Sequence, residues 1–560
     1  MKKRILALLS TLVLFTTVCN TTLFAQTVTF WDDMPNEQLA QAITDQMTDT
    51  ELYSQILMFG WAGAEPDQLL YDWVERGLGN VKVFGWNTND IHLVAKSVSS
   101  LQKNAQQNRF KIPLFVATDQ EGGSIRHVKG DTSITPGNMA IGASGYPADA
   151  WYSAYYISRE IRALGINMNF APTVDLFTNH ESSIIGIRSF GDDPQKAGIL
   201  GAAFSAGSKA AGIIPTVKHF PGHGDTDLDS HGKLPQIDID FETFKNRELV
   251  PYMYLVNDDT TAIMSGHLSF PQIDQSGAPA SLSKYFLTDL LRGQLGYDGL
   301  IITDDMEMAG ATIYAGTISN AFKMAIEAGN DIILSSRTAN LNEALWYKNL
   351  NLMATDSSFH ARVKDAAYRV IKAKLDYYKN GNLTAPLYPD PDSIDQYIPD
   401  KEGEKFFIEQ ACRSITIQKQ GEAFPLDTSK SGRILIIGSL SSFFNDALAR
   451  YPNAGQVHVN YDTGPNETQW VLEQLPSISA NFDTVIICVS NDNHVKIAQY
   501  FRNSGKKVIV LSTMSPELTK NLDWCDTILL GYSWRCEYSL TAMLAAINGE
   551  YVPAGVKPYK

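Results

Sequence analysis

The sequence predicts an α/β protein in which an N-terminal (β/α)8 TIM-like barrel is followed by a smaller C-terminal α/β sandwich domain. Eight short apolar, β-branched runs alternate with helix-like segments between about residues 56 and 336, which indicates a parallel sheet wound as a barrel. Four more such runs follow in the last third of the chain. The length of 560 residues also favours more than one domain, because single hydrophobic cores rarely exceed about 300 residues.

The first 25 residues are typical of an export signal. A basic start (KKR) precedes an apolar run over residues 5–15, and Ala25 is a small residue suited to cleavage. Cys19 offers an alternative as a lipid-attachment site, but Val18 before it is bulkier than such sites usually accept. We therefore expect a signal peptide over residues 1–25 and a periplasmic or extracellular protein.

The predicted barrel domain extends over residues 26–380. Helix-like segments such as 151–165 and 195–212 separate its strand-like runs. The runs end in polar residues or glycine, and they read ILMFG (56–60), VKVFG (81–85), PLFVATD (113–119), NMNFAP (167–172), IPTVKHF (214–220), TAIMSGH (261–267), GLIITDD (299–305) and DIILSS (331–336). Active sites in this fold lie at the carboxyl ends of the strands. Those ends carry the polar residues Asp119, Lys218, His219, His267, Asp304 and Asp305.

A stretch rich in proline, aspartate and glycine over residues 381–403 predicts a linker. The sandwich domain follows over residues 404–560, with strand-like runs at 433–439, 484–490, 507–512 and 527–532. The sequence GSLSS after the first of these runs lacks the glycine spacing of a dinucleotide site, so no nucleotide is expected there.

The four cysteines beyond the signal do not have metal-ligand spacing. One disulfide among them is compatible with an oxidising compartment, and burial as small hydrophobic residues is the alternative. They are Cys412, Cys488, Cys525 and Cys536.

Charge and hydropathy exclude several classes of partner. The formal net charge of −15 disfavours a nucleic-acid partner, since phosphate backbones require clustered lysine and arginine. No apolar stretch of 18 residues occurs after the first thirty, so no membrane span is expected downstream. No pattern in the sequence predicts an oligomeric state.

The segment KHFPGHGDTDLDSH, residues 218–231, has the residue types of a metal site, a phosphate loop or an acid/base site. His219 and His223 are four residues apart, but Pro221 and Gly222 between them prevent the helix that would bring both to one metal ion. The aspartates of the segment and the negative chain would repel an anion. Acid/base chemistry therefore fits best, and we expect neither a metal nor an organic cofactor.

Asp229 and His231 are close enough for the carboxylate to hydrogen-bond the imidazole, which would raise the histidine pKa from about 6.5 and keep it useful as an acid. A mobile loop could bring this pair over a substrate. The pair needs a second carboxylate at the barrel mouth, and Asp304 at the end of a hydrophobic strand is suited to that role. Asp305 is the better candidate for capping the helix that follows.

Four motifs resemble those of glycoside hydrolase family 3, in its β-N-acetylglucosaminidase branch. They are KHFPGHGDTDLDSH, DQEGGS (119–124), IIGIRSFGDDP (184–194) and GYDGLIITDDM, and they occur in the family's order. More faintly, ACRSITIQKQGEAFPL is similar to the start of the family's second domain.

The resemblance implies a role for each matching residue. Asp304 would be the nucleophile, and His231 the general acid/base oriented by Asp229. The substrate-binding residues would be Asp119, Arg188, Lys218 and His219, with Asp119 at the pocket floor and the others near the remaining hydroxyls and the acetamido group. Lys218 or Arg188 could instead be a buried partner of Asp119.

One position departs from the pattern. The branch usually carries an arginine eight residues after the pocket aspartate, and this chain has His127 there with Arg126 one residue earlier. Either the loop is shifted by one residue or a substrate contact is altered, which leaves the preference beyond the first sugar open.

The predicted function is that of an exported retaining exo-β-N-acetylglucosaminidase (β-N-acetylhexosaminidase) acting on peptidoglycan fragments or chitooligosaccharides through a covalent glycosyl-enzyme. The alternatives are a substrate-assisted hexosaminidase, a β-glucosidase-like enzyme, and a non-catalytic sugar-binding protein.

Overall fold

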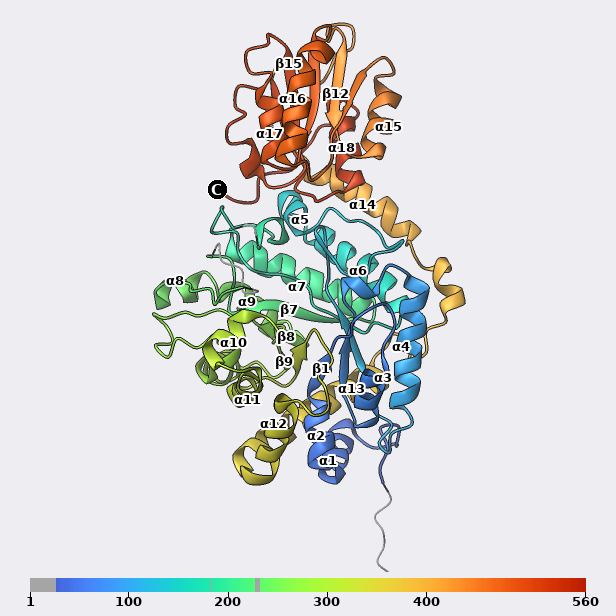
Figure 1. Ribbon diagram of the computed structural model, residues 1–560, viewed down its shortest axis with the longest axis vertical. Helices are drawn as coiled ribbons and strands as arrows, with labels where there is room; N and C mark the ends of the chain where they lie inside the picture. The colour runs from blue at the N-terminus through green and yellow to red at the C-terminus, as the bar shows by residue number, and fades with distance from the viewer. Residues whose placement is uncertain (1–26, 183, 227–231) are drawn as a thin grey trace, which may run out of the picture.

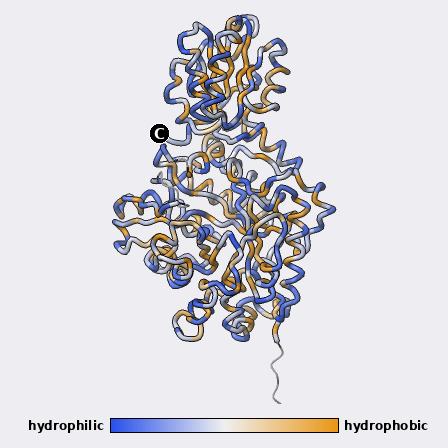
Figure 2. Tube along the Cα trace, in the orientation of Figure 1, coloured by the Kyte–Doolittle hydropathy of each residue, from blue (hydrophilic) through white to orange (hydrophobic). Residues whose placement is uncertain are grey.

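The computed structural model describes residues 27–182, 184–226 and 232–560. Two units lie end to end along the long axis in Figure 1, with the N-terminal unit below and the C-terminal unit above it. The hydrophobic segments in Figure 2 concentrate in the interior of both units, where the strands run.

Eight parallel strands form the N-terminal barrel. They are β1 (Leu57–Phe59), β2 (Asn80–Lys82), β3 (Phe115–Thr118), β6 (Met168–Asn169), β7 (Ile214–Phe220), β8 (Ala262–Ser265), β9 (Leu300–Thr303) and β10 (Ile333–Ser335). The order in the sheet is β10-β1-β2-β3-β6-β7-β8-β9, and a parallel bridge between Ile302 and Ile332 joins its two ends. Each strand overlaps one of the predicted runs, so the predicted barrel is confirmed.

Helices surround the barrel on its outer side. They are α1 (Asn36–Gln46), α2 (Asp49–Gln55), α3 (Gln68–Glu75), α4 (Ile91–Ala105), α5 (Asn138–Ser144), α6 (Pro147–Ala163), α7 (Pro194–Ala210), α8 (Phe241–Asn246), α9 (Val250–Asn257), the π-helix η4 (Tyr285–Gln294), α10 (Ala309–Ala315), α11 (Ile318–Ala328), α12 (Ala344–Thr355) and α13 (Ser357–Asn380). Local sequence explains where they begin: α7, for example, starts at a proline, and the side chain of Asp193 caps it by accepting from two backbone N–H groups.

Short elements lie at the rim of the barrel. They are the hairpin of β4 (Gln120–Gly122) and β5 (Ile125–Arg126), and the 3-10 helices η1 (Gly85–Asn87), η2 (Gly186–Arg188) and η3 (Ala280–Leu282). The hairpin follows β3 directly, and η1 follows β2. Both elements therefore shape the carboxyl end of the barrel, where the candidate site lies.

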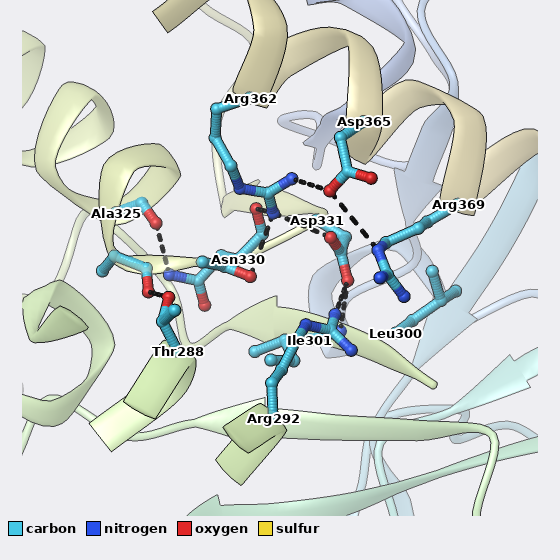
Figure 3. Close-up of polar contacts among 12 residues, drawn as sticks. Thr288, Arg292, Leu300, Ile301, Ala325, Asn330, Asp331, Arg362, Asp365 and Arg369 are labelled. Carbon is cyan, nitrogen blue, oxygen red and sulfur yellow. Dashed lines mark hydrogen bonds and ion pairs between the residues drawn. The ribbon is translucent and has the colours of Figure 1, made fainter. Parts of the chain in front are cut away.

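A buried ionic network holds β9 against β10 at the amino ends of these strands (Figure 3). The carboxylate of Asp331 accepts from Arg292 Nη2 at 2.6 Å, from Arg362 Nη2 at 2.8 Å and from the backbone N–H of Ile301 at 3.0 Å. Because Asp331 is fully buried, each of its oxygens needs such partners. The network closes the barrel at the end opposite the candidate site.

The C-terminal unit contains a six-stranded sheet with helices on both faces, which confirms the predicted second α/β domain. Its strands are β11 (Thr416–Lys419), β12 (Ile434–Gly438), β13 (Gly455–His458), β14 (Thr484–Val489), β15 (Lys507–Ser512) and β16 (Thr527–Leu530), in the order β11-β16-β15-β14-β12-β13. Only β11 runs antiparallel to its neighbour. The helices are α14 (Lys401–Ser414), α15 (Ser441–Arg450), α16 (Pro465–Ser479), α17 (Asp492–Gln499) and α18 (Glu537–Ile547), with η6 (Pro516–Thr519).

Two smaller expectations concern this half of the chain. Residues 381–403, which were expected to form a linker, contain the 3-10 helix η5 (Pro391–Gln396) and the first turn of α14. Cys412, Cys488, Cys525 and Cys536 are free, so the disulfide alternative does not apply to them; all but Cys412 are buried.

The end of the chain packs at the junction of the two units (Figure 1). The ring of Tyr559 lies 4.8 Å from that of Phe177, which follows β6 in the barrel, and its hydroxyl donates to Glu517 in the C-terminal unit. The backbone N–H of Asp192 donates to the carbonyl of Pro558. This tail therefore joins the segment between β6 and α7 to the C-terminal unit.

Across the three described ranges, no helix combines the length and the apolar character needed to cross a membrane.

Candidate active site

Side chains from several strands meet at the carboxyl end of the barrel. Asp119 follows β3, Lys218 and His219 lie in the second half of β7, and Asp304 follows β9. His267 lies two residues after β8. The structure thus places these five sequence-predicted residues at the end of the barrel where the fold positions its active sites.

Two lysines hold the carboxylate of Asp119. Lys218 Nζ donates to Oδ1 at 2.5 Å, and Lys82 Nζ lies 2.6 Å from Oδ2. Burial alone would raise the pKa of Asp119, but Lys218 and Lys82 hold it well below its usual range. Asp119 is therefore an ionised hydrogen-bond acceptor. Lys218 is a buried ion-pair partner of Asp119, which agrees with the alternative expectation for this lysine.

Glu121 is a second buried carboxylate beside Asp119. Arg188 binds it through Nε at 3.0 Å and Nη2 at 2.7 Å, and Lys218 Nζ lies 2.7 Å from Oε1. Burial raises the pKa of Glu121, but Arg188 and Lys218 outweigh burial and lower it to about 2. Arg188 thus has a fixed orientation at the edge of the site, set by a bidentate ion pair.

Asp175 orients the next group of the site. Its Oδ2 lies 2.7 Å from Nδ1 of His219, and its carboxylate also accepts from the backbone N–H groups of His219 and His223. Burial would raise the pKa of Asp175, but the contacts with His219 and, to a smaller extent, His223 outweigh burial and lower the pKa to about 2. An ionised Asp175 is an acceptor for an Nδ1 proton of His219, and this contact orients the imidazole ring.

The environment of Asp304 favours the ionised form of its carboxylate. Its backbone N–H donates to Ser265 on β8, and its Oδ1 accepts from the N–H of Asp305 at 2.8 Å. Within the described part of the chain, no ion pair occupies its carboxylate. Burial raises the pKa of Asp304, but His219, His267 and the Asp305 N–H lower it overall. The side chain is half-buried.

Asp305 does not cap the following helix, so that expectation is wrong. Helix α10 begins at Ala309 with Met308 as its N-cap residue. The Oδ1 of Asp305 instead accepts from the backbone N–H groups of Glu307 and Ser336, which joins the loop after β9 to the end of β10. The strand ends too many residues before the helix for this aspartate to reach its first turn.

Arg126 and His127 have separate environments. Arg126 points to Thr132, whose carbonyl and hydroxyl accept from its Nη1. His127 Nδ1 lies 3.5 Å from Asp119 Oδ2 without a hydrogen bond. Burial, the largest cause, lowers the pKa of His127 to about 4, so the ring is uncharged near neutrality and the contact is not an ion pair.

Asp229 and His231 lie outside the described residues, so their predicted geometry stays a prediction.

The described histidines of the same motif do not form a metal site. His219 and His223 have ring centroids 5.8 Å apart, and Nδ1 of His219 contacts Asp175. Among the residues with described positions, no group of three histidine, cysteine, aspartate or glutamate side chains is placed to hold a metal ion.

Comparison with known proteins identifies the family of the barrel. The model of the glycosyl hydrolase family 3 N-terminal domain matches residues 51–373, which is more than half of the chain. The chain belongs to glycosyl hydrolase family 3. The predicted family is therefore confirmed, and the protein is assigned to the glycoside hydrolases.

Relatives with curated names match about half of this family 3 chain. Beta-hexosaminidase A of Pseudoalteromonas piscicida is 36% identical over 274 residues, which are 46% of this chain and 45% of that protein. Beta-hexosaminidase of Pseudomonas aeruginosa is 36% identical over 273 residues, 49% of this chain and 78% of that protein. The chain thus spans less than half the length of the first of these relatives.

Solved structures extend the likeness to both units of the family 3 protein. A glycoside hydrolase family 3 beta-N-acetylglucosaminidase from Paenibacillus has a TM-score of 0.82 at 26% identity, covering 92% of this chain and 99% of that one. A fungal multi-domain family 3 beta-N-acetylglucosaminidase has a TM-score of 0.81 at 28% identity, covering 92% of this chain and 61% of that one.

Three residues of the family 3 site were not assigned by the sequence: Lys82, Glu121 and Asp175. Glu121 lies inside the quoted DQEGGS motif, two residues after Asp119, and a second acidic residue so close to the strand end could have drawn attention. Asp175 lies in the segment after β6 but not directly at the strand end, as Asp119 does after β3, so its position gave a weaker signal. Lys82 is a cation at the end of an apolar strand run, and this position in the sequence could have identified it as a candidate site residue.

Proposed function

We propose that this protein is a retaining exo-β-N-acetylglucosaminidase. Membership of family 3 supports glycoside hydrolysis, and the names of the Paenibacillus and fungal structures, both beta-N-acetylglucosaminidases, support N-acetylglucosamine as the sugar. The curated relatives named beta-hexosaminidase agree with that sugar class.

The observation that carries the proposal is the position of Asp304 relative to Asp119. Strands β9 and β3 are four places apart in either direction around an eight-stranded barrel, so these residues face each other across its mouth. A pyranose ring between them would present C1 to Asp304 and its far hydroxyls to Asp119 and Lys218. One carboxylate is free for attack, and the other is fixed for recognition.

The first step forms a bond between an Asp304 oxygen and C1 while the bond from C1 to the leaving oxygen breaks. His231 donates its proton to that oxygen, and Asp229 keeps the imidazole oriented. The low pKa of Asp304 favours attack, because the carboxylate is ionised throughout the neutral range. The product of this step is a covalent glycosyl-enzyme.

In the second step His231 takes a proton from water, whose oxygen attacks C1 and releases Asp304. Two inversions at C1 retain the β configuration. His219, Lys218 and Arg188 hold the acetamido group and the remaining hydroxyls. Their own partners, Asp175 and Glu121, keep them in place between turnovers.

Export through the N-terminal signal and action on peptidoglycan fragments or chitooligosaccharides are part of the proposal. Expression of the full chain in a bacterial host tests the first point: protein recovered outside the cytoplasm should begin at Gln26 by mass spectrometry. Product analysis with both oligosaccharides tests the second, and release of terminal N-acetylglucosamine from either is the expected result.

A fluorinated N-acetylglucosaminyl donor that accumulates covalent intermediates tests the mechanism. Peptide mapping of the wild-type protein should find the sugar on Asp304, and Asp304→Asn should abolish labelling and turnover. Asp305→Asn is the matched control, since the neighbouring Asp305 carboxylate accepts from the backbone N–H groups of Glu307 and Ser336. It should still be labelled at Asp304.

Each alternative has its own outcome. Turnover without any adduct would favour a substrate-assisted hexosaminidase, and faster cleavage of aryl β-glucosides would favour a β-glucosidase. Binding of N-acetylglucosamine without turnover of any glycoside would indicate a sugar-binding protein. Loss of activity in EDTA would reopen the question of a metal.

A further inference from the structure

Lys82 is a buried lysine at the carboxyl end of β2. Its side chain is 6% exposed, and its Nζ lies 2.6 Å from Asp119 Oδ2. The ammonium also lies over the rings of Phe84 and Phe170, at 4.1 and 5.0 Å from their centroids. Desolvating a lysine is costly, so a chain keeps one in such a place only where its charge is used.

The positive charge beside Oδ2 of Asp119 comes from Lys82, because the neighbouring His127 cannot supply it. His127 approaches the same oxygen, but its ring is neutral near pH 7 and makes no hydrogen bond to Asp119. Lys218 holds only the other oxygen and is shared with Glu121. Without Lys82, one oxygen of Asp119 would face an uncharged ring and two aromatic side chains.

We infer that Lys82 is a positioning residue for sugar recognition: it holds Asp119 in the orientation that accepts hydroxyl groups from the end of the sugar opposite C1. The inference rests on the proposed function and extends it to a residue of β2. Each oxygen of Asp119 carries one ammonium, so the carboxylate plane is fixed between β2 and β7. A sugar hydroxyl then meets a lone pair of known direction.

The consequence concerns the hydroxyl at C4, which lies across the ring from C1. A carboxylate held by Lys218 alone is free to rotate toward Glu121 and Arg188. Misplacement of a recognition group by about 1 Å typically costs about 100-fold in kcat/KM. Lys82 therefore contributes to selectivity for the C4 hydroxyl as well as to the rate.

The test compares Lys82→Met, Lys82→Arg and the double variant Lys82→Met with His127→Arg. Activity is measured on 4-nitrophenyl N-acetyl-β-glucosaminide and its 4-deoxy analogue, and N-acetylglucosamine binding by isothermal titration calorimetry. K82M should lose about 100-fold in kcat/KM on the parent substrate but less than about 10-fold on the 4-deoxy substrate. K82R should stay within about fivefold of wild type, and an arginine at position 127 should restore about 10-fold to K82M, because it reaches the same oxygen.

Lys374→Met is the matched control. Lys374 is also a buried lysine of the barrel, but it donates to Gln55 and to the carbonyl of Gly79 at the amino ends of the strands. K374M should lower the melting temperature and keep kcat/KM within about twofold below that temperature. The contrast separates loss of stability from loss of recognition.

The outcomes distinguish this inference from the proposed function. Unchanged kcat/KM and sugar affinity in K82M would overturn the inference while the proposed function stands. Equal losses on both substrates without recovery by H127R would reduce Lys82 to a structural lysine and overturn it too. A wild-type protein that binds N-acetylglucosamine without hydrolysis, and whose K82M variant binds more weakly, would overturn the proposed function and support the inference. Absence of both binding and turnover in the wild type would overturn both.

Discussion

Replacing Glu121 by glutamine removes one buried negative charge from the site while keeping the size of the side chain. Glu121 is bound by both donors of the Arg188 guanidinium edge and by Lys218. Glu121 and Lys218 are almost completely withdrawn from solvent, and the side chain of Arg188 is 14% exposed. E121Q therefore leaves two buried cations with one carboxylate fewer between them.

The magnitude follows from the pKa of Glu121, which falls from an ordinary 4.5 to about 2 in the folded protein. At about 1.4 kcal/mol for each pH unit, the ionised form adds about 3 kcal/mol to stability. Because the folded-state pKa is the lower one, this stability is present above about pH 4.5 and is lost as the pH falls toward 2. E121Q should lack it at pH 7, and the deficit should shrink by about half at pH 3.

Differential scanning calorimetry at pH 7 and pH 3 measures the effect, expected as a fall of about 5 °C in melting temperature at pH 7. Glu343→Gln is the matched control. Glu343 also accepts two hydrogen bonds from one guanidinium, here from Nη1 and Nη2 of Arg337, and its pKa is also about 2, but the side chains of Glu343 and Arg337 are 24% and 43% exposed. Solvent screening should keep the loss of unfolding free energy in E343Q below about 1 kcal/mol. Equal losses in the two variants, or an E121Q deficit of the same size at both pH values, would refute the reasoning.

Two further predictions concern the ends of the barrel. Asp331→Asn should cost about 3–5 kcal/mol in unfolding free energy, because it leaves two guanidinium groups partly unpaired in the buried network of Figure 3. Asp298→Asn, whose side chain is 93% exposed beside Arg369, should cost less than about 0.5 kcal/mol; similar losses in chemical denaturation would contradict this ranking. At the site, His127→Gln should leave the pH dependence of kcat/KM between pH 5 and 8 unchanged, since the pKa of His127 is about 4. Disappearance of an ionisation near pH 6 in that variant would show that the histidine titrates during turnover.

The sequence predicted the barrel well because its strands are buried on both faces and therefore form continuous apolar runs. The strands at the edges of the second sheet were missed for the opposite reason. In β11 and β13, buried and exposed residues are mixed, and polar residues such as Gln456 and His458 interrupt the pattern. Edge strands with one protected side do not produce an apolar run.

The site was predictable where a residue stands at the end of a strand, as Asp119 and Asp304 do. The site was less predictable where a contact joins residues from two different strands. The pairing of Lys82 with Asp119, and of Asp175 with His219, depends on which strands are neighbours in space. Position along the chain does not reveal such partners. The failure at Asp305 came from the length of the turn after β9, which local propensity does not fix.

The segment between β6 and α7 contacts residues of the candidate site and also the C-terminal unit. It carries Asp175 and Arg188 toward the pocket, while Phe177 and Asp192 meet the last residues of the chain. One segment of the barrel unit therefore contacts Glu121 and His219 at one end of its path and the last residues of the chain at the other. Tyr559 in turn binds Glu517, so the C-terminal unit contributes to the surroundings of this segment.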